Sequence, residues 1–182
     1  MLLRKATEVF LELILASGLA TALAVASVFT FYRYVRRPST VLMFFNTAAS
    51  AALILTGTLL LENHNVLIAY LFFVAYFYAY TSLGRHVARY DDTFRMLFLS
   101  MGYTRQEFFV NYLLVRGKWK LVDNILTFSV IGTAIVVFCD EVRRLYPDQG
   151  RTIIFTLIVF SVLISVSSWL SSDYVNTASK EE

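Results

Sequence analysis

Residues able to bind a metal or attack a substrate are few in this 182-residue chain and lie far apart. The one cysteine, Cys139, excludes an internal disulfide and a cysteine-based zinc or iron–sulfur site within one chain. The two histidines, His64 and His86, flank one apolar tract about 33 Å apart along a helix, so they cannot share a metal there. The sequence contains no Ser-His-Asp set, glycine-rich phosphate loop or HExxH motif. It therefore predicts neither a catalytic centre nor a bound cofactor.

A different chemistry, the docking of one surface on another, is indicated by residues 94–114, FRMLFLSMGYTRQEFFVNYLL. Gly102 can adopt the left-handed backbone conformation that ends a helix. Thr104 follows it, and Glu107 three residues later completes the Thr-x-x-Glu pattern of a capping box that begins a new helix. The segment is therefore predicted to form a helix, a sharp turn and a second helix.

Aromatic and other apolar side chains flank this turn on both sides. They recur at helical spacing and are Phe94, Phe98 and Met101 before the turn, and Phe108, Phe109 and Tyr112 after it. An exposed apolar ridge beside a turn is typical of a site that contacts a partner protein or lipid headgroups. The composition equally fits a helix that only lies along the membrane surface.

Long tracts without charged residues surround the turn and indicate that the chain lies in a bilayer. Hydrophobic residues make up 58% of the chain and charged residues 16%. A hydrocarbon core of about 30 Å needs roughly 20 helical residues. Five spans are predicted, and the fourth needs residues on both sides of Asp123 to reach that length: about 13–32, 41–61, 66–83, 121–139 and 152–172.

The predicted fold is an all-α integral membrane protein with a single transmembrane domain over residues 1–182. It is a bundle of four or five transmembrane helices with a helix-turn-helix segment at 84–120. Residues 1–12 place apolar side chains on one helical face and charged ones on the other. This pattern predicts either a short helix in the membrane interface or an extension of the first span.

Lysines and arginines predict the orientation, because cytoplasmic loops carry the excess. Residues 84–120 hold seven of them, which predicts a cytoplasmic location for this segment and for the C-terminus in a multi-pass protein of the cell membrane. If all five tracts cross, the N-terminus lies outside and the cytoplasmic side holds 11 lysines and arginines against 5. If 41–61 does not cross, the N-terminus lies inside and the count is 10 against 6. The charges alone do not separate these two arrangements.

The segment FLSMGYTRQEFF, residues 98–109, resembles part of a known family. It is similar to the permease subunits of ABC transporters of the FtsX/MacB class, which includes the BceB-type peptide-antibiotic exporters. In that family a span continues as a cytoplasmic helix, turns at Leu-Gly-(Ala/Met)-(Thr/Ser)-Arg and returns by a second helix. Gly102, Thr104 and Arg105 match that turn, and Tyr103 occupies its variable position. The resemblance covers roughly residues 66–172, although the family's common Arg-Glu-Ile-Gly-like core is replaced by Tyr-Asp-Asp-Thr at 90–93.

The resemblance implies a permease subunit of an ATP-driven transporter or mechanotransmission complex. Its turn would dock on a separate ATP-binding subunit of an ABC transporter. The ATPase-coupling residues carried over by position are Phe98, Met101, Gly102, Tyr103, Thr104, Arg105 and Phe108. Because the chain has no Walker motif, it is expected to lack ATPase activity itself. The expected substrate is an amphipathic peptide or a lipid-like molecule.

The chain departs from the family in lacking a large extracellular domain and in carrying the extra tract 41–61, which is rich in small residues. A chain of this size supplies one permease half, so a second copy or a related permease subunit is expected beside it. Membrane lipids are further expected partners, and nucleic acid is not. The alternative interpretation is a small non-transporting membrane scaffold or accessory subunit that recruits a soluble partner.

Overall fold

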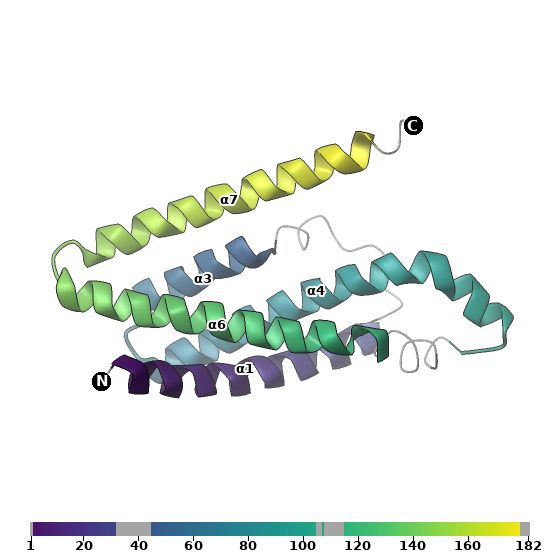
Figure 1. Ribbon diagram of the computed structural model, residues 1–182, viewed down its shortest axis with the longest axis horizontal. Helices are drawn as coiled ribbons and strands as arrows, with labels where there is room; N and C mark the ends of the chain where they lie inside the picture. Colours follow the sequence, from purple (N-terminus) through teal and green to yellow (C-terminus); the bar gives the residue numbers. More distant parts are fainter. Residues whose placement is uncertain (1, 32–44, 105–106, 108–114, 179–182) are drawn as a thin grey trace.

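Five helices make up the regular structure of the residues that the computed structural model describes, which are 2–31, 45–104, 107 and 115–178 (Figure 1). The described residues form no strand. In chain order the helices are α1 (Leu2–Phe31), α3 (Thr47–Leu60), α4 (His64–Ser100), α6 (Val115–Leu145) and α7 (Gly150–Ala178). This confirms the prediction of an all-helical fold.

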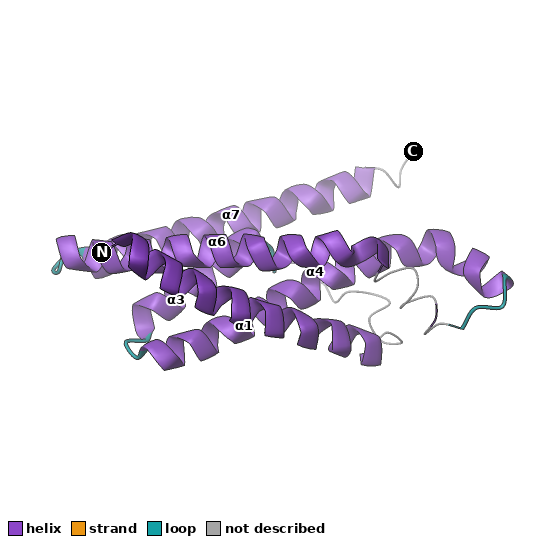
Figure 2. Ribbon diagram, turned by 60° about the horizontal axis from the view of Figure 1, so that its bottom comes forward, coloured by secondary structure: helices purple, strands orange, loops and turns teal. Residues whose placement is uncertain are grey.

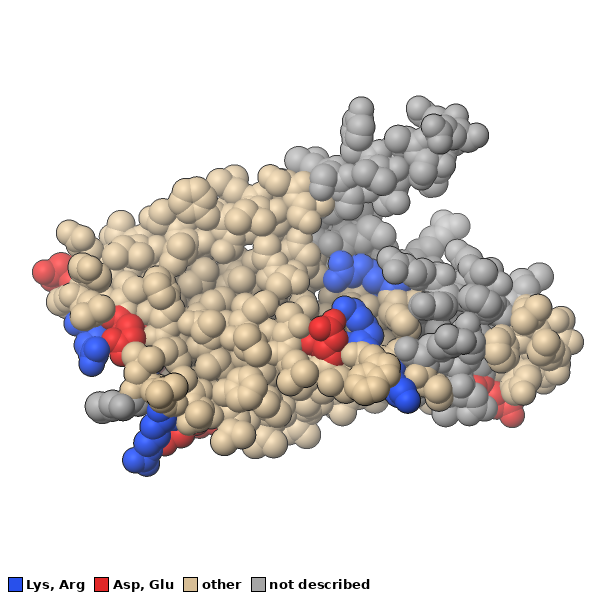
Figure 3. Space-filling model, in the orientation of Figure 1, with Lys and Arg blue, Asp and Glu red and all other residues tan. Residues whose placement is uncertain are grey.

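Four of these helices are long and apolar enough to cross a bilayer. The apolar segments are Leu2–Thr30, His64–His86, Gly117–Leu145 and Gly150–Ser168. Charged side chains gather toward the two ends of the visible face, with a broad uncharged surface between them (Figure 3). The chain is thus a multi-pass membrane protein, as its composition predicts.

Helices α1 and α4 lie side by side and run in the same direction. Glu12 Oε2 lies 2.9 Å from His64 Nε2, and the Tyr76 hydroxyl donates a hydrogen bond to Ser27 Oγ at 3.0 Å. The chain between two parallel neighbours must return to the end at which the first began. The N-terminus therefore lies at the end of the bundle opposite to residues 84–120. The arrangement in which both share one side does not fit this packing.

Helix α6 runs antiparallel to α1, between α1 and α3. Lys5 Nζ lies 2.7 Å from Asp140 Oδ2, and Ser17 and Ser129 share a hydrogen bond of 3.0 Å deep in the bundle. Leu13, Ile54 and Leu71 come from three different helices and are fully buried. Helix α7 packs mainly on α3 and diverges from α6 toward its C-terminus (Figures 1 and 2).

The second predicted span is shorter than expected. The prediction covers 41–61, of which residues 41–44 lie outside the described residues. Helix α3 itself has 14 residues, or about 21 Å of helix. It begins after Asn46, which caps the helix by accepting a hydrogen bond from the Ala49 amide at 2.9 Å. At its other end Arg143 donates hydrogen bonds to the carbonyls of Thr58 and Leu59. The guanidinium pairs with carbonyls that have no partner within the helix, and its positive charge complements the partial negative charge of the helix C-terminus.

The first twelve residues extend the first span rather than forming a separate interfacial helix. Helix α1 is continuous over 30 residues, or about 45 Å. Its N-terminal turns are held to the bundle by the Lys5–Asp140 and Glu12–His64 pairs. These pairs use Lys5 and Glu12, whereas Arg4 and Glu8 pair with each other on the exposed side of the helix.

Gly57 permits a close contact between α3 and α4. A Cβ atom at Gly57 would lie 2.5 Å from the Tyr70 ring, which is too close for a real contact. The ring cannot simply swing away, because the Tyr70 hydroxyl donates to the Leu53 carbonyl at 3.1 Å. Small residues let helices approach in this way within a membrane.

We therefore expect Gly57→Ala to destabilise the protein by about 1–3 kcal/mol, the usual cost of overpacking. Gly18→Ala is the matched control, because a Cβ at Gly18 meets nothing within 4 Å. Replacing a helical glycine by alanine there should be neutral or stabilising. Thermal unfolding of both purified variants in mild detergent tests this, and equal melting temperatures would contradict the packing at Gly57.

Candidate functional site

Helix α4 continues beyond the rest of the bundle and ends in a projecting segment (Figures 1 and 2). Its packing on α6 reaches Ser82, which donates to Asn124 Oδ1 at 2.9 Å, and His86, which faces Gly117. About 14 further residues, roughly 21 Å of helix, lead to Ser100. We call residues 97–104 the tip. The prediction that the third span continues as a charged helix is confirmed.

The tip is shaped by the way the helix ends. Gly102 has φ 85°, in the left-handed region. The next backbone amide, Tyr103 N, donates a hydrogen bond to the Phe98 carbonyl at 3.1 Å and closes the turn. This six-to-one hydrogen bond around a left-handed glycine is a Schellman motif. The rings of Phe98 and Tyr103 also meet edge to face, with centroids 5.5 Å apart. An apolar contact between these two positions usually accompanies the motif and fixes the direction of the outgoing chain.

The predicted capping box is present immediately after the turn. Thr104 N and Oγ1 both donate to Glu107 Oε2 at 2.8 Å, and Glu107 N donates to Thr104 Oγ1 at 3.3 Å. The hydrogen bond from the Thr104 backbone, and then that from its hydroxyl, hold the pKa of Glu107 below its usual value of 4.5. The second helix, predicted to follow, lies outside the described residues.

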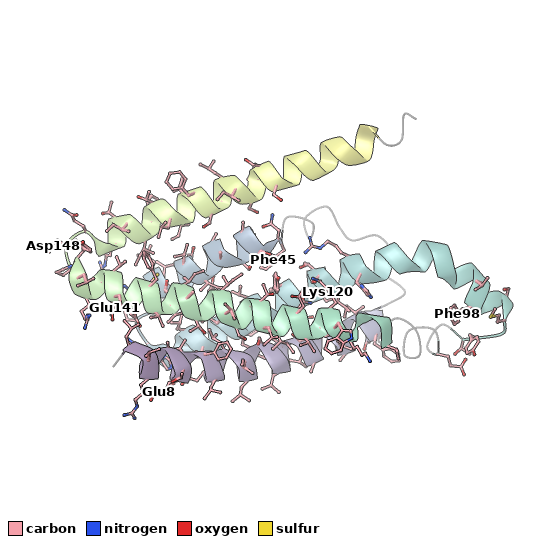
Figure 4. All side chains as sticks on the ribbon, viewed as in Figure 1. Glu8, Phe45, Phe98, Lys120, Glu141 and Asp148 are labelled. Carbon is pink, nitrogen blue, oxygen red and sulfur yellow. The ribbon has the colours of Figure 1, made fainter. Side chains whose placement is uncertain are left out.

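Five of the seven residues predicted for docking come together at the tip. Phe98, Met101, Gly102, Tyr103 and Thr104 all lie there, and the labelled Phe98 marks the place in Figure 4. Arg105 and Phe108 lie outside the described residues. The charged Glu8, Glu141 and Asp148 lie at the opposite end of the molecule (Figure 4).

The exposed apolar surface of the tip differs in one respect from the sequence prediction. Leu97 is 52% exposed, Met101 64% and Tyr103 43%. Phe98 is half-buried and packs on Tyr103. Leu97 was not among the predicted docking residues, although its spacing of four from Met101 puts both on one side of the helix.

The described residues offer no grouping of three or more His, Cys, Asp or Glu side chains that could hold a metal ion. His64 pairs with Glu12 and His86 lies at the other end of the membrane segment of α4. Cys139 is buried and accepts a hydrogen bond from Thr58 Oγ1 at 3.4 Å.

We expect the capping box to be pH-dependent. Because the Glu107 pKa is lowered in the folded chain, its stabilisation is complete above pH 4.5 and is lost as the pH falls through the lower, folded value. The Thr104 amide chemical shift, measured by NMR in micelles down to about pH 3, should move with this protonation. Glu107→Gln is the control, since it keeps an acceptor but cannot titrate. A wild-type shift that stays as flat as the control's would contradict the box.

The protein's relationships give no further guide to the role of this tip. No protein-family model matches the chain, and no curated protein and no solved structure matches it either. What the tip does is therefore inferred from its geometry and from the resemblance of its sequence to a permease turn.

Proposed function

We propose that the chain is the membrane-spanning subunit of an ATP-driven, ABC-type complex and that its tip docks on a separate ATP-binding subunit. The observation that carries this proposal is the single 37-residue helix α4, which runs from within the bundle to the tip. A partner that moves the tip would move a helix packed against α1, α3 and α6. Such a helix can transmit a partner's motion into the membrane.

The tip has the properties of a prearranged docking surface. The Schellman turn and the capping box fix its backbone, and Met101 and Tyr103 are exposed on it. A surface that is ordered before binding loses less conformational entropy on association. A few apolar and aromatic anchors usually carry most of the binding energy of an interface. The match of Gly102 and Thr104 to the permease turn favours an ATP-binding subunit as the partner.

We assign the tip to the cytoplasm. The described parts of α1 and α4 lie parallel, which fits the sequence arrangement in which all five tracts cross. In that arrangement the side of residues 84–120 has 11 lysines and arginines against 5 on the other side. The excess of basic residues marks the cytoplasmic side.

The pairing of buried polar side chains favours a substrate that moves along the outside of the bundle. Ser17 pairs with Ser129 and Ser82 with Asn124 across helices. Pairs of this kind serve to hold helices together rather than to line a route for a polar solute. An amphipathic peptide or lipid-like substrate at the interface with a second permease subunit, identical or related, fits this arrangement.

The second candidate is a non-transporting scaffold that recruits a soluble partner. The same pairing of buried polar side chains favours it, because a scaffold needs the tip but no substrate route. The two candidates differ in the identity of the protein that binds the tip.

Affinity purification in mild detergent with mass spectrometry tests the proposal. An ATP-binding subunit should co-purify with the wild type and fall at least about tenfold with Tyr103→Asp, because a charge would be buried in an apolar contact. Tyr146→Asp is the matched control, since Tyr146 is also exposed but lies at the opposite end. It should leave the recovery unchanged.

A second pair of variants tests the shape of the turn. Gly102→Val should lower recovery, because a β-branched residue is strained at φ 85°, whereas Gly102→Asn should retain it, since asparagine tolerates this conformation. Recovery of a different soluble protein that depends on Tyr103 would support the scaffold. If no protein depends on Tyr103, both candidates are wrong.

A further inference from the structure

A polar cavity of about 430 Å³ lies at the base of the projecting part of α4. It opens where α3 begins, where the membrane segment of α4 ends and where α6 enters the bundle. Its lining residues come from these three helices and are Thr47, Tyr78, Ser82, Arg85, His86 and Lys120. The cavity is separate from the tip, and Figure 4 labels Lys120 at its edge.

The lining is rich in hydrogen-bond donors and carries positive charge. Arg85 and Lys120 are cationic, and no Asp or Glu is among the described residues that line the cavity. Lys120 Nζ also contacts Asp123 Oδ2 at 2.7 Å, so part of its charge is offset from outside the lining. Arg85 contributes a guanidinium, whose planar set of donors suits phosphate oxygens.

Behind this lining lies a further donor. Asn124 is 2% exposed and accepts from Ser82, and its Nδ2 group is buried without a hydrogen-bond partner in the described part of the chain. Buried amide groups are normally satisfied. The surplus of donors over acceptors indicates that the ligand supplies acceptor oxygens.

The position of the cavity relative to the apolar segments of α4 and α6 indicates the source of such a ligand. The apolar segment of α4 ends at His86 and that of α6 begins at Gly117, so Arg85 and Lys120 lie at the boundary between hydrocarbon and water. Phospholipid phosphates lie at this level, and basic side chains there attract anionic headgroups.

An apolar groove beside the cavity favours a lipid over a free anion. The groove, of about 330 Å³, lies between α3 and α7 and is lined by Phe45, Ala49 and Val162 among others. The first turn of α3 contributes Ala49 to the groove and Thr47 to the polar cavity, and the two spaces share no lining residue. A molecule with a phosphate group and an acyl chain would match both spaces around this turn.

We propose that this cavity binds the phosphate of an anionic phospholipid, held by Arg85 and Lys120, with an acyl chain in the groove between α3 and α7. The site stands independently of what docks at the tip. It would select lipids by net charge, because a zwitterionic headgroup brings its own cation to the basic lining.

Native mass spectrometry of the protein in neutral detergent, titrated with phosphatidylglycerol or phosphatidylcholine, tests the proposal. Phosphatidylglycerol should bind more tightly. Arg85→Gln and Lys120→Gln should each weaken it about fivefold, which corresponds to about 1 kcal/mol for one basic residue at the membrane surface. Arg85→Lys should retain most of the binding, which separates loss of charge from loss of fold.

Lys118→Gln is the matched control. Lys118 lies on the same helix, its ammonium is 5.9 Å from the Trp119 ring centroid, and it does not line the cavity. Its replacement should leave phosphatidylglycerol binding unchanged. Equal binding of the two lipids, or equal losses in the Lys118 and Lys120 variants, would overturn the proposal.

Competition with inorganic phosphate shows whether the cavity binds the phosphate of a lipid or free phosphate. If the lipid is the ligand, millimolar phosphate should compete weakly, and Val162→Trp, which fills the groove, should reduce phosphatidylglycerol binding. If phosphate competes fully and Val162→Trp has no effect, the site binds free phosphate and the lipid assignment is wrong.

Discussion

Hydrocarbon supplies no hydrogen bonds, so every polar group within the bundle has to find its partner inside the protein. This constraint explains the most unusual part of the fold, the short helix α3. The last carbonyls of this helix have no partners within the helix itself. Arg143, 85 and 84 residues away from Thr58 and Leu59, provides them. The amide of Ala49 is similarly satisfied by Asn46 at the start of the helix. A helix too short to cross a bilayer alone is thus completed by side chains at both its ends.

The same constraint explains the pairing of α1 with α4, which sets the direction of the chain. Tyr76 and Ser27 satisfy each other between these helices, and Glu12 and His64 meet near the end. With two neighbours held parallel, the segment between them has to return across the bundle. The N-terminus and the tip therefore lie at opposite ends of the bundle, which the counts of basic residues alone did not decide.

Structural features formed by residues close in sequence were predictable, whereas contacts between residues far apart in sequence were not. Gly102, Thr104 and Glu107 act within a few residues of one another, so their spacing alone predicted the helix end and the capping box that the structure has. The start of α3 after Asn46 was not predictable, because apolar residues lie on both sides of Asn46 and hydrophobicity does not indicate a cap. Ser82 and Asn124 are 42 residues apart, and nothing in either neighbourhood indicates that they meet. The cavity at Arg85 is formed by three helices whose arrangement the sequence does not reveal, whereas the exposure of Leu97 could have been inferred from its spacing of four from Met101.

Helix α4 passes through three environments without a break in its backbone hydrogen bonding: the lipid-facing bundle, the charged boundary near His86 and the projection that ends at Ser100. A helix satisfies its own backbone wherever it lies, so it can leave the bundle without exposing unpaired groups in any of the three. It also resists bending more than a loop of equal length would. The tip therefore follows directly on the same continuous helix that packs on the bundle at Ser82 and His86. Because the basic cavity lies against the base of that element, whatever fills the cavity and whatever holds the tip both act on the same helix.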